Sequence, residues 1–297
     1  MTILRTDDRR FEQLPGYEFA AHYLEALPAA AGARLHYLDE GRADAEVVWL
    51  CLHGQPTWSY LYRKMIPRFV AAGHRVIAPD LLGFGRSDKP EDEAFYSFDR
   101  HREVLRQLIE QLDLRGIRLV CQDWGGLLGL TLPMAMAERF AGLLVMNTGL
   151  GTGDVPLGEG FLAWRAYAAS QPDLDIAGLM KRSTPVLSEA EAAAYAAPFP
   201  DARYKAGVRC FPQLVPDHPE APGAEVSRQA RTWWREQWNG RSLMAIGMQD
   251  PVLGPPAMRY LHKQIRGCPP PIEIAEAGHF VQEWGAPIAE RAVQELT

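Results

Sequence analysis

A strand–turn–helix segment near the middle of the chain constrains the fold more than any other part of the sequence. Residues 117–121 (IRLVC) are largely apolar, which predicts a buried strand, and residues 127–137 predict a helix. Gly125 and Gly126 lie in the turn between them. A sharp strand-to-helix turn needs small neighbours because its backbone is strained, and it presents one side chain at its tip. The sequence places Asp123 at that tip, which predicts a reactive carboxylate at the end of a central strand.

The residue type at the tip decides which chemistry is possible. A carboxylate that attacks a saturated carbon forms an alkyl ester, which water can open, whereas a serine in the same place would form an ether, which is a dead end. Asp123 therefore predicts substitution at saturated carbon rather than ordinary ester hydrolysis. The alternative is that Asp123 only caps the helix that follows it, as aspartate often does.

Length, charge and cysteine usage bound the remaining possibilities. A chain of 297 residues fits one large α/β domain, or a domain with an inserted subdomain. The net charge of −6 provides no basic surface, which argues against a nucleic-acid partner. No apolar run approaches the ~20 residues that span a bilayer, and the charged N-terminus lacks the apolar core of a secretion signal. The four cysteines are scattered, which fits reduced residues better than a metal site or disulfides. We therefore expect a cytoplasmic monomer that needs neither a metal nor a cofactor and contacts no membrane.

Strand and helix patterns alternate along the first half of the chain, with helices expected at residues 60–72 and 99–112. This alternation predicts an α/β fold with a mostly parallel sheet flanked by helices. The pattern stops in a proline-rich stretch of helical segments and resumes further on. We expect a core formed by residues 1–150 and 228–297, with an inserted helical cap at residues 151–227 that encloses a small apolar cavity. A separate tandem domain is the alternative.

Polar residues follow four of the predicted strands. The segment 53–56 (HGQP) follows an early strand, Asp123 lies at the turn, Asp250 follows the next-to-last strand and His279 follows the last. The carboxyl ends of parallel strands meet at one edge of a sheet, where ligands bind. A nucleophile, an acid and a histidine in this chain order form the catalytic arrangement of α/β-hydrolases.

Each of these residues has an expected role. His279 is the predicted general base, because an ordinary pKa of ~6.5 suits proton removal from water near neutral pH. Asp250 is expected to orient the imidazole, whereas Asn147, at the end of an earlier strand, carries no charge. The backbone N–H groups of Gln55 and Trp124 are expected to form an oxyanion hole. The alternatives are that His279 is an ordinary histidine of a surface loop and that Asp250 is a turn aspartate before a proline, which is common.

Three motifs together resemble those of the haloalkane dehalogenases, and the likeness covers nearly the whole chain. They are residues 53–61 (HGQPTWSYL), 122–126 (QDWGG) and 278–283 (GHFVQE). The cap stretches 180–182 and 189–201 resemble the branch that acts on short dihaloalkanes and carries its acid after the next-to-last strand. The resemblance implies that the elbow aspartate displaces halide and that the histidine then activates water to open the ester.

The resemblance also implies where the halide and the substrate bind. The indole N–H of Trp124 is expected to donate to the departing halide. That branch normally supplies a second tryptophan from the cap, but this chain has Ser183 there, so the Gln55 side-chain amide is the expected replacement and Trp164 a further candidate. The residues expected to line the substrate pocket are Leu179, Phe211, Pro212, Val215 and Phe280.

Two other functional classes compete with this hypothesis. An epoxide hydrolase uses the same aspartate, histidine and acid on the same fold, together with cap tyrosines that protonate the epoxide oxygen; the candidates are Tyr167, Tyr195 and Tyr204. Trp124 and Gln55 favour halide instead. A binding protein without enzymatic activity is the third class, and the intact nucleophile, base and acid argue against it. The expected partners are a small apolar halogenated substrate, halide ion and water.

Overall fold

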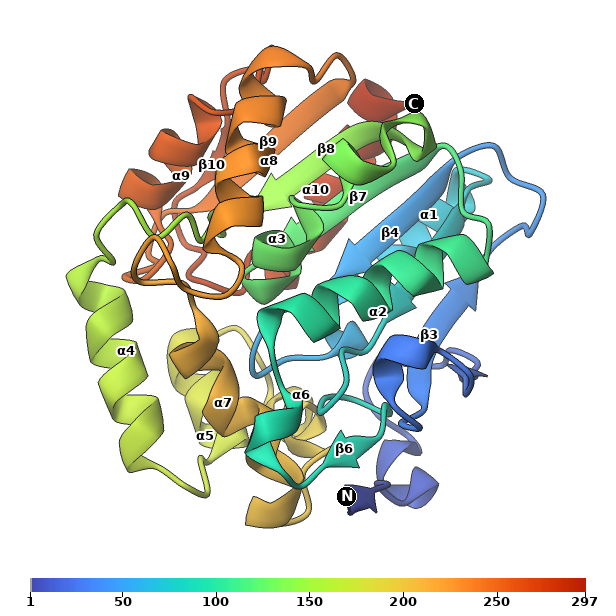
Figure 1. Cartoon of the computed structure of the whole chain (residues 1–297). Coiled ribbons are helices and arrows are strands. Elements are labelled where there is room, and N and C mark those ends of the chain that lie inside the picture. Colours follow the sequence, from blue (N-terminus) through green and yellow to red (C-terminus); the bar gives the residue numbers. More distant parts are fainter. Residues whose placement is uncertain (1) are drawn as a thin grey trace.

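The computed structural model describes residues 2–297 as a sheet with helices on both faces (Figure 1). The strands are β1 (Ile3–Leu4), β2 (His22–Leu24), β3 (Leu35–Glu40), β4 (Val48–Leu52), β5 (Arg75–Pro79), β6 (Lys89–Pro90), β7 (Ile117–Gln122), β8 (Phe140–Met146), β9 (Arg241–Gly247) and β10 (Ile272–Ile274). The α-helices are α1 (Ile66–Ala71), α2 (Phe98–Gln111), α3 (Trp124–Gly129), α4 (Glu159–Ser170), α5 (Ile176–Ser183), α6 (Glu189–Ala196), α7 (Ala206–Leu214), α8 (Ala224–Glu236), α9 (Pro255–His262) and α10 (Gly285–Leu296).

The main sheet has eight strands in the order β10-β9-β8-β7-β4-β5-β3-β2. Every neighbouring pair from β10 to β5 is parallel, and only β3 and β2 are antiparallel to their neighbours. The central strands β4, β7 and β8 are buried along most of their length, as expected for parallel strands that are covered on both faces. This confirms the predicted α/β-hydrolase architecture.

Helices α2, α3 and α8 cover one face of the sheet, and α1 and α10 cover the other (Figure 1). The arrows of β4 and β8 point toward a group formed by α4, α5, α6 and α7, which is the segment expected to form the cap. This group follows β8 in the chain, and the described residues between β8 and α8 contain no strand. None of the helices within residues 2–297 combines the length and apolar content that crossing a bilayer requires.

Two helices are shorter than the sequence pattern predicts. The segments expected at residues 60–72 and 127–137 contain Pro67 and Pro133, which lack the N–H that would bond to the carbonyl four residues earlier. The first segment therefore splits into the 3-10 turn η3 (Ser59–Tyr62) and α1. The second forms only the helix α3, which ends at Gly129, and short 3-10 turns follow it. Apolar periodicity predicted where these helices lie, but not where they break.

A buried carboxylate, Asp80, connects the loops on one side of the sheet. It accepts hydrogen bonds from His36 Nδ1 at 2.7 Å and from the backbone N–H groups of Ser59 and Arg86 at 2.7 and 2.8 Å. Burial raises the pKa of this carboxyl, but His36, His53 and the Ser59 donor outweigh burial and lower the pKa to about 2. Asp80 therefore stays ionised and holds the segment before α1 against the loop after β5.

The variant Asp80→Asn is expected to lower the free energy of unfolding at pH 7 by about 3 kcal/mol, because it removes the charge to which buried donors are bound. The folded pKa lies below the ordinary value of 3.8, so this stabilisation is present above pH ~4 and is lost as the pH falls toward 2. Urea denaturation of both proteins at several pH values measures the difference. Asp44→Asn, at an exposed pair with Arg42, is the control and should change nothing. A difference that did not shrink at acid pH would contradict this account.

Candidate active site

Asp123 lies at the tip of a strained turn between β7 and α3. Its backbone has φ of 51° and ψ of −126°, a left-handed conformation that is unfavourable for any residue except glycine. A Cβ at Gly125 would lie 1.9 Å from the Leu52 carbonyl oxygen, and one at Gly54 would lie 2.1 Å from Asp123 Oδ1. Only glycine fits at either position. The Asp123 side chain makes no capping bond to α3, which argues against the capping alternative.

The structure brings Asp123, His279 and Asp250 together after the ends of β7, β10 and β9, as the chain order predicts. His279 Nδ1 lies 2.7 Å from Asp250 Oδ2, and His279 Nε2 lies 3.5 Å from Asp123 Oδ2. The Asp250 side chain is fully buried, whereas those of His279 and Asp123 are 14% and 15% exposed. The imidazole therefore bridges two carboxylates at a partly accessible site.

The position between two carboxylates changes the acidity of His279. Burial lowers its pKa, but the charge of Asp250 and the contacts with Asp123 raise it more, to about 10. The pKa of Asp250 is lowered, because contacts with His279 and Asn147 outweigh the effect of burial. The contacts with the two acids therefore favour the protonated form of the imidazole. The ordinary pKa expected from the sequence does not apply to this state, since one residue's type says nothing about its neighbours in space.

Asn147 holds the acid in place, a role that sequence reasoning missed. Its Nδ2 donates to Asp250 Oδ2 at 2.9 Å, and its Oδ1 accepts from the Gly247 N–H at 2.8 Å. The other oxygen of Asp250 accepts from the Val252 N–H at 2.8 Å. A signal was present, because Asn147 directly follows β8, the neighbour of the strand that precedes Asp250.

Hydrogen-bond donors surround the elbow. The Gln55 backbone N–H donates to Asp123 Oδ1 at 2.8 Å. Trp124 is the first residue of α3, so its backbone N–H has no partner within the helix. The Gln55 side-chain amide donates to the Val208 carbonyl on α7 at 2.9 Å. The indole N–H of Trp124 has no acceptor among residues 2–297, whereas that of Trp234 donates to a backbone carbonyl.

A cavity of about 550 Å³ opens in front of Asp123. Gln55, Trp124 and Asp250 line it from the core, and Trp164 lines it from α4. Much of the remaining wall comes from two segments that sequence reasoning missed, residues 149–161 and 251–264. The first is rich in glycine and follows a central strand, which was a usable signal for a ligand-binding loop.

The five predicted pocket residues fall into two groups. Pro212 and Val215 line the cavity. The other three do not: Phe211 packs against Trp124 with ring centroids 4.6 Å apart, Phe280 packs edge-on to His279 at 5.0 Å, and Leu179 lies on α5. Phe211 and Phe280 therefore support residues of the site from behind.

The sequence and the fold are both similar to those of known proteins. The family profile described as alpha/beta hydrolase fold matches residues 48–286. A haloalkane dehalogenase of Psychrobacter cryohalolentis is 47% identical over 301 residues, which cover 99% of this chain and 98% of the relative. The chain belongs to the haloalkane dehalogenase family. A second family member, from Mycobacterium marinum, is 44% identical over 99% of both chains.

Solved structures agree with this assignment. The haloalkane dehalogenase DpaA from Paraglaciecola agarilytica NO2, described as tetrameric, has a TM-score of 0.98 and 49% identity over 100% of this chain and 99% of its own. DatA from Agrobacterium tumefaciens C58 has a TM-score of 0.75 at 23% identity, covers 94% of this chain and 97% of its own, and shows the shared fold alone. The family expected from the motifs is confirmed; the branch within it stays a prediction.

Asp250→Asn is expected to lower the pKa of His279 substantially from its value of about 10, because it removes the charge that raises that pKa most. A pH titration of the ¹⁵N-labelled imidazole by NMR measures the change. Asp217→Asn, which removes the carboxylate beside the surface residue His218, is the matched control and should leave His279 unchanged. An unchanged His279 pKa in Asp250→Asn would show that the 2.7 Å contact does not control the proton.

Proposed function

We propose that this protein hydrolyses short haloalkanes to an alcohol and a halide ion through a covalent ester on Asp123. The observation that carries the proposal is the imidazole of His279 placed between an elbow aspartate and a buried acid. Family membership supports the same reaction. A carboxylate at this tip favours attack on saturated carbon, because the resulting ester can be opened again.

In the first step, Asp123 Oδ2 attacks the carbon that bears the halogen, the carbon–halogen bond breaks, and halide leaves with the bonding electron pair. The Gln55 N–H holds the other oxygen and so fixes the orientation of the carboxylate. The indole N–H of Trp124 donates to the departing anion. A hydrogen-bond donor that is already in position stabilises a developing anion most strongly in a site shielded from water.

In the second step, His279 takes a proton from water while the water oxygen attacks Asp123 Cγ. The backbone N–H groups of Gln55 and Trp124 stabilise the negative charge on the carbonyl oxygen. The bond from Cγ to the alkoxy oxygen then breaks, that oxygen takes the proton from the His279 imidazolium and leaves as alcohol, and the Asp123 carboxyl is regenerated and ionises. Each cycle also releases one proton. Ester formation removes the charge of Asp123, which lowers the pKa of His279 and so favours the neutral imidazole that the second step needs.

The epoxide hydrolase alternative needs a tyrosine in the cavity, and the tyrosine found there among residues 2–297 is Tyr260 on α9 rather than a cap residue. The cavity lining includes none of the three tyrosines that the sequence offered for that role, Tyr167, Tyr195 and Tyr204, all within the described part of the chain. Tyr195 donates its hydroxyl to Glu283 instead. These placements and the family comparisons favour halide as the leaving group.

Residues 151–227 are proposed as the cap, inserted in a core of residues 1–150 and 228–297; nearly all of this segment lies between β8 and α8, and its last residues form the first turn of α8. Four helices and no strand in that segment support the division. The cavity has Pro212 and Val215 on its cap side and Asp123 on its core side. The cap would exclude water from the ester-forming step and so strengthen the contacts around the halide.

Two side chains are candidates for the second halide donor, since the Ser183 hydroxyl donates to the Leu179 carbonyl and does not line the cavity. Both Gln55 and Trp164 line it. One N–H of the Gln55 amide donates to Val208, and the other has no acceptor among residues 2–297. Because the Val208 contact restricts the orientation of the amide, we favour Trp164 as the partner of Trp124.

We also propose that the protein works in the cytoplasm as a monomer. All four cysteines are free, which suits a reducing compartment. One chain supplies the triad and the cavity, so the site needs no second copy. Since DpaA is described as tetrameric, light scattering at working concentration is the measurement that decides the oligomeric state.

Asp123→Asn is expected to abolish turnover, because an amide cannot displace halide. His279→Gln is expected to release one halide per protein and to retain the alkyl group as an ester on Asp123, detected by intact-protein mass and peptide mapping. The substrates are short chloro- and bromoalkanes, with epoxides assayed in parallel. Full turnover by Asp123→Asn, or diol formation without halide release by the wild type, would overturn the proposal.

Trp164→Phe is expected to weaken product inhibition by bromide about 30-fold, because losing one donor in such a site costs ~2–4 kcal/mol. Gln55→Leu, which keeps the backbone N–H on Asp123, should weaken it less. Bromide inhibition constants of the two variants measure the ranking. A larger loss in Gln55→Leu would assign the second donor to the glutamine.

A further inference from the structure

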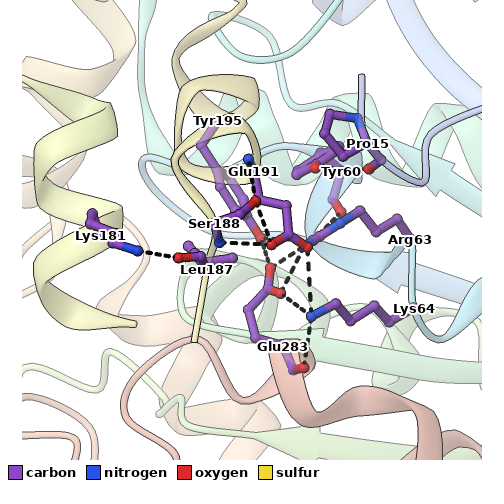
Figure 2. Close-up of polar contacts among 10 residues, drawn as sticks. All are labelled: Pro15, Tyr60, Arg63, Lys64, Lys181, Leu187, Ser188, Glu191, Tyr195 and Glu283. Atoms are coloured by element: carbon purple, nitrogen blue, oxygen red, sulfur yellow. Dashed lines mark hydrogen bonds and ion pairs between the residues drawn. The ribbon is translucent and has the colours of Figure 1, made fainter. Parts of the chain in front are cut away.

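A buried polar cluster joins the cap to the two segments that follow the catalytic loops (Figure 2). Its members are Arg63, Lys64, Glu191, Tyr195 and Glu283. Arg63 and Lys64 directly follow η3, and Glu283 lies in the 3-10 turn η8 (Val281–Trp284). Glu191 and Tyr195 belong to α6 in the proposed cap. None of these five residues lines the cavity.

Glu283 is the centre of this cluster. The Arg63 guanidinium binds it with both ends of its fork, Nη1 to Oε1 at 2.6 Å and Nη2 to Oε2 at 2.8 Å. Lys64 Nζ lies 2.8 Å from Oε2, and the Tyr195 hydroxyl donates to Oε1. The Glu283 side chain is fully buried, and that of Arg63 is 2% exposed. These donors fix the position of the carboxylate.

On the cap side, the cluster binds α6 at its beginning and at its end. Glu191 accepts from Arg63 Nη2 at 2.8 Å, and its other oxygen accepts from the Ser188 N–H at 2.9 Å, which caps the helix. The Tyr195 ring packs edge-on to Tyr60 with centroids 5.0 Å apart. The core thus holds α6 through both a charge and an aromatic contact.

Stability alone is a weak reason for such a cluster. Its two cations and two carboxylates balance, but the cost of removing buried charges from water offsets much of their attraction, so apolar side chains of similar size would hold the cap as well. Apolar packing is not directional, so it would not fix the position of η8 relative to α6. The hydrogen bonds between the paired charges have a defined geometry and do fix it.

The position of η8 bears directly on His279. Phe280 is the only residue between His279 and η8, and its carbonyl accepts from the Glu283 N–H at 3.1 Å. On the other side of His279, a Cβ at Gly278 would lie 3.1 Å from the Ser183 carbonyl at the end of α5. The His279 segment therefore lies close to the cap at Gly278 and is bonded to η8 on its other side.

We propose that Glu283, held by Arg63 and Tyr195, positions His279 for attack of water on the ester, so that the cap–core cluster controls the hydrolysis step. This inference rests on the proposed two-step function. The alkylation step depends on the Gln55 loop, which has separate anchors in the Ser59 contact with Asp80 and the Leu81 contact with His53. Hydrolysis depends in addition on where the imidazole lies.

The test is Tyr195→Phe, which removes one donor to Glu283 and keeps the ring packed on Tyr60. The ester-hydrolysis rate is expected to fall about 10-fold, within the ~100-fold that a 1 Å misplacement can cost, and the alkylation rate to change less than ~2-fold. Rapid-quench measurement of the burst of halide release gives the alkylation rate. Mass spectrometry of the quenched samples follows the ester and gives the hydrolysis rate. Glu191→Gln, which removes the charge opposite Arg63 but keeps an acceptor for Ser188, should shift them in the same direction and carries the test if Tyr195→Phe does not fold.

The matched control is Glu93→Gln. It removes the carboxylate that Arg209 on α7 contacts at 2.6 Å, so it also breaks a cap–core ion pair, but one that involves neither η8 nor α6. Its ratio of hydrolysis to alkylation should equal that of the wild type. An unchanged ratio in both cluster variants, or an equal fall of both rates, would overturn the inference. If His279→Gln formed no ester at all, the proposed function itself would fail, which is a separate and distinguishable result.

Discussion

The segments that follow β4 and β7 approach so closely that only glycine fits at positions 54 and 125, and this contact places Asp123. The Leu52 carbonyl lies where a Cβ of Gly125 would be, and Asp123 Oδ1 lies where a Cβ of Gly54 would be. The same approach brings the Gln55 N–H to the carboxylate. Backbone geometry therefore orients the nucleophile, and the left-handed conformation at Asp123 is the strain that the surrounding sheet sustains.

Charge around the imidazole makes the two chemical steps compatible. Two carboxylates hold a proton on His279 in the free protein, and ester formation removes one of them. A histidine with a permanently low pKa would leave Asp123 without a cationic neighbour, and one with a permanently high pKa could not act as a base. The reaction itself makes the base easier to deprotonate, because ester formation neutralises Asp123, one of the two carboxylates that raise the pKa of His279.

The elbow, the parallel sheet and the triad were predictable because each depends on local pattern or chain order. Apolar strands, small residues around Asp123 and polar residues after strands Arg241–Gly247 and Ile272–Ile274 all appear directly in the sequence. Asn147 was missed because its place after strand Phe140–Met146 was considered only for a charged acid, and not for an amide that binds the acid of the neighbouring strand. The same limit applies to Phe211 and Phe280, whose type suited a pocket but whose packing partners are Trp124 and His279.

The Asp123 side chain makes no bond to the helix that it precedes, and this has an evolutionary consequence. The turn is shaped by glycines and by the backbone, so the helix α3 does not depend on a carboxylate at its tip. A scaffold of this kind can exchange its nucleophile, and with it the class of bond it breaks, without first rebuilding its core. Selection on chemistry and selection on folding then act on different residues of the same turn.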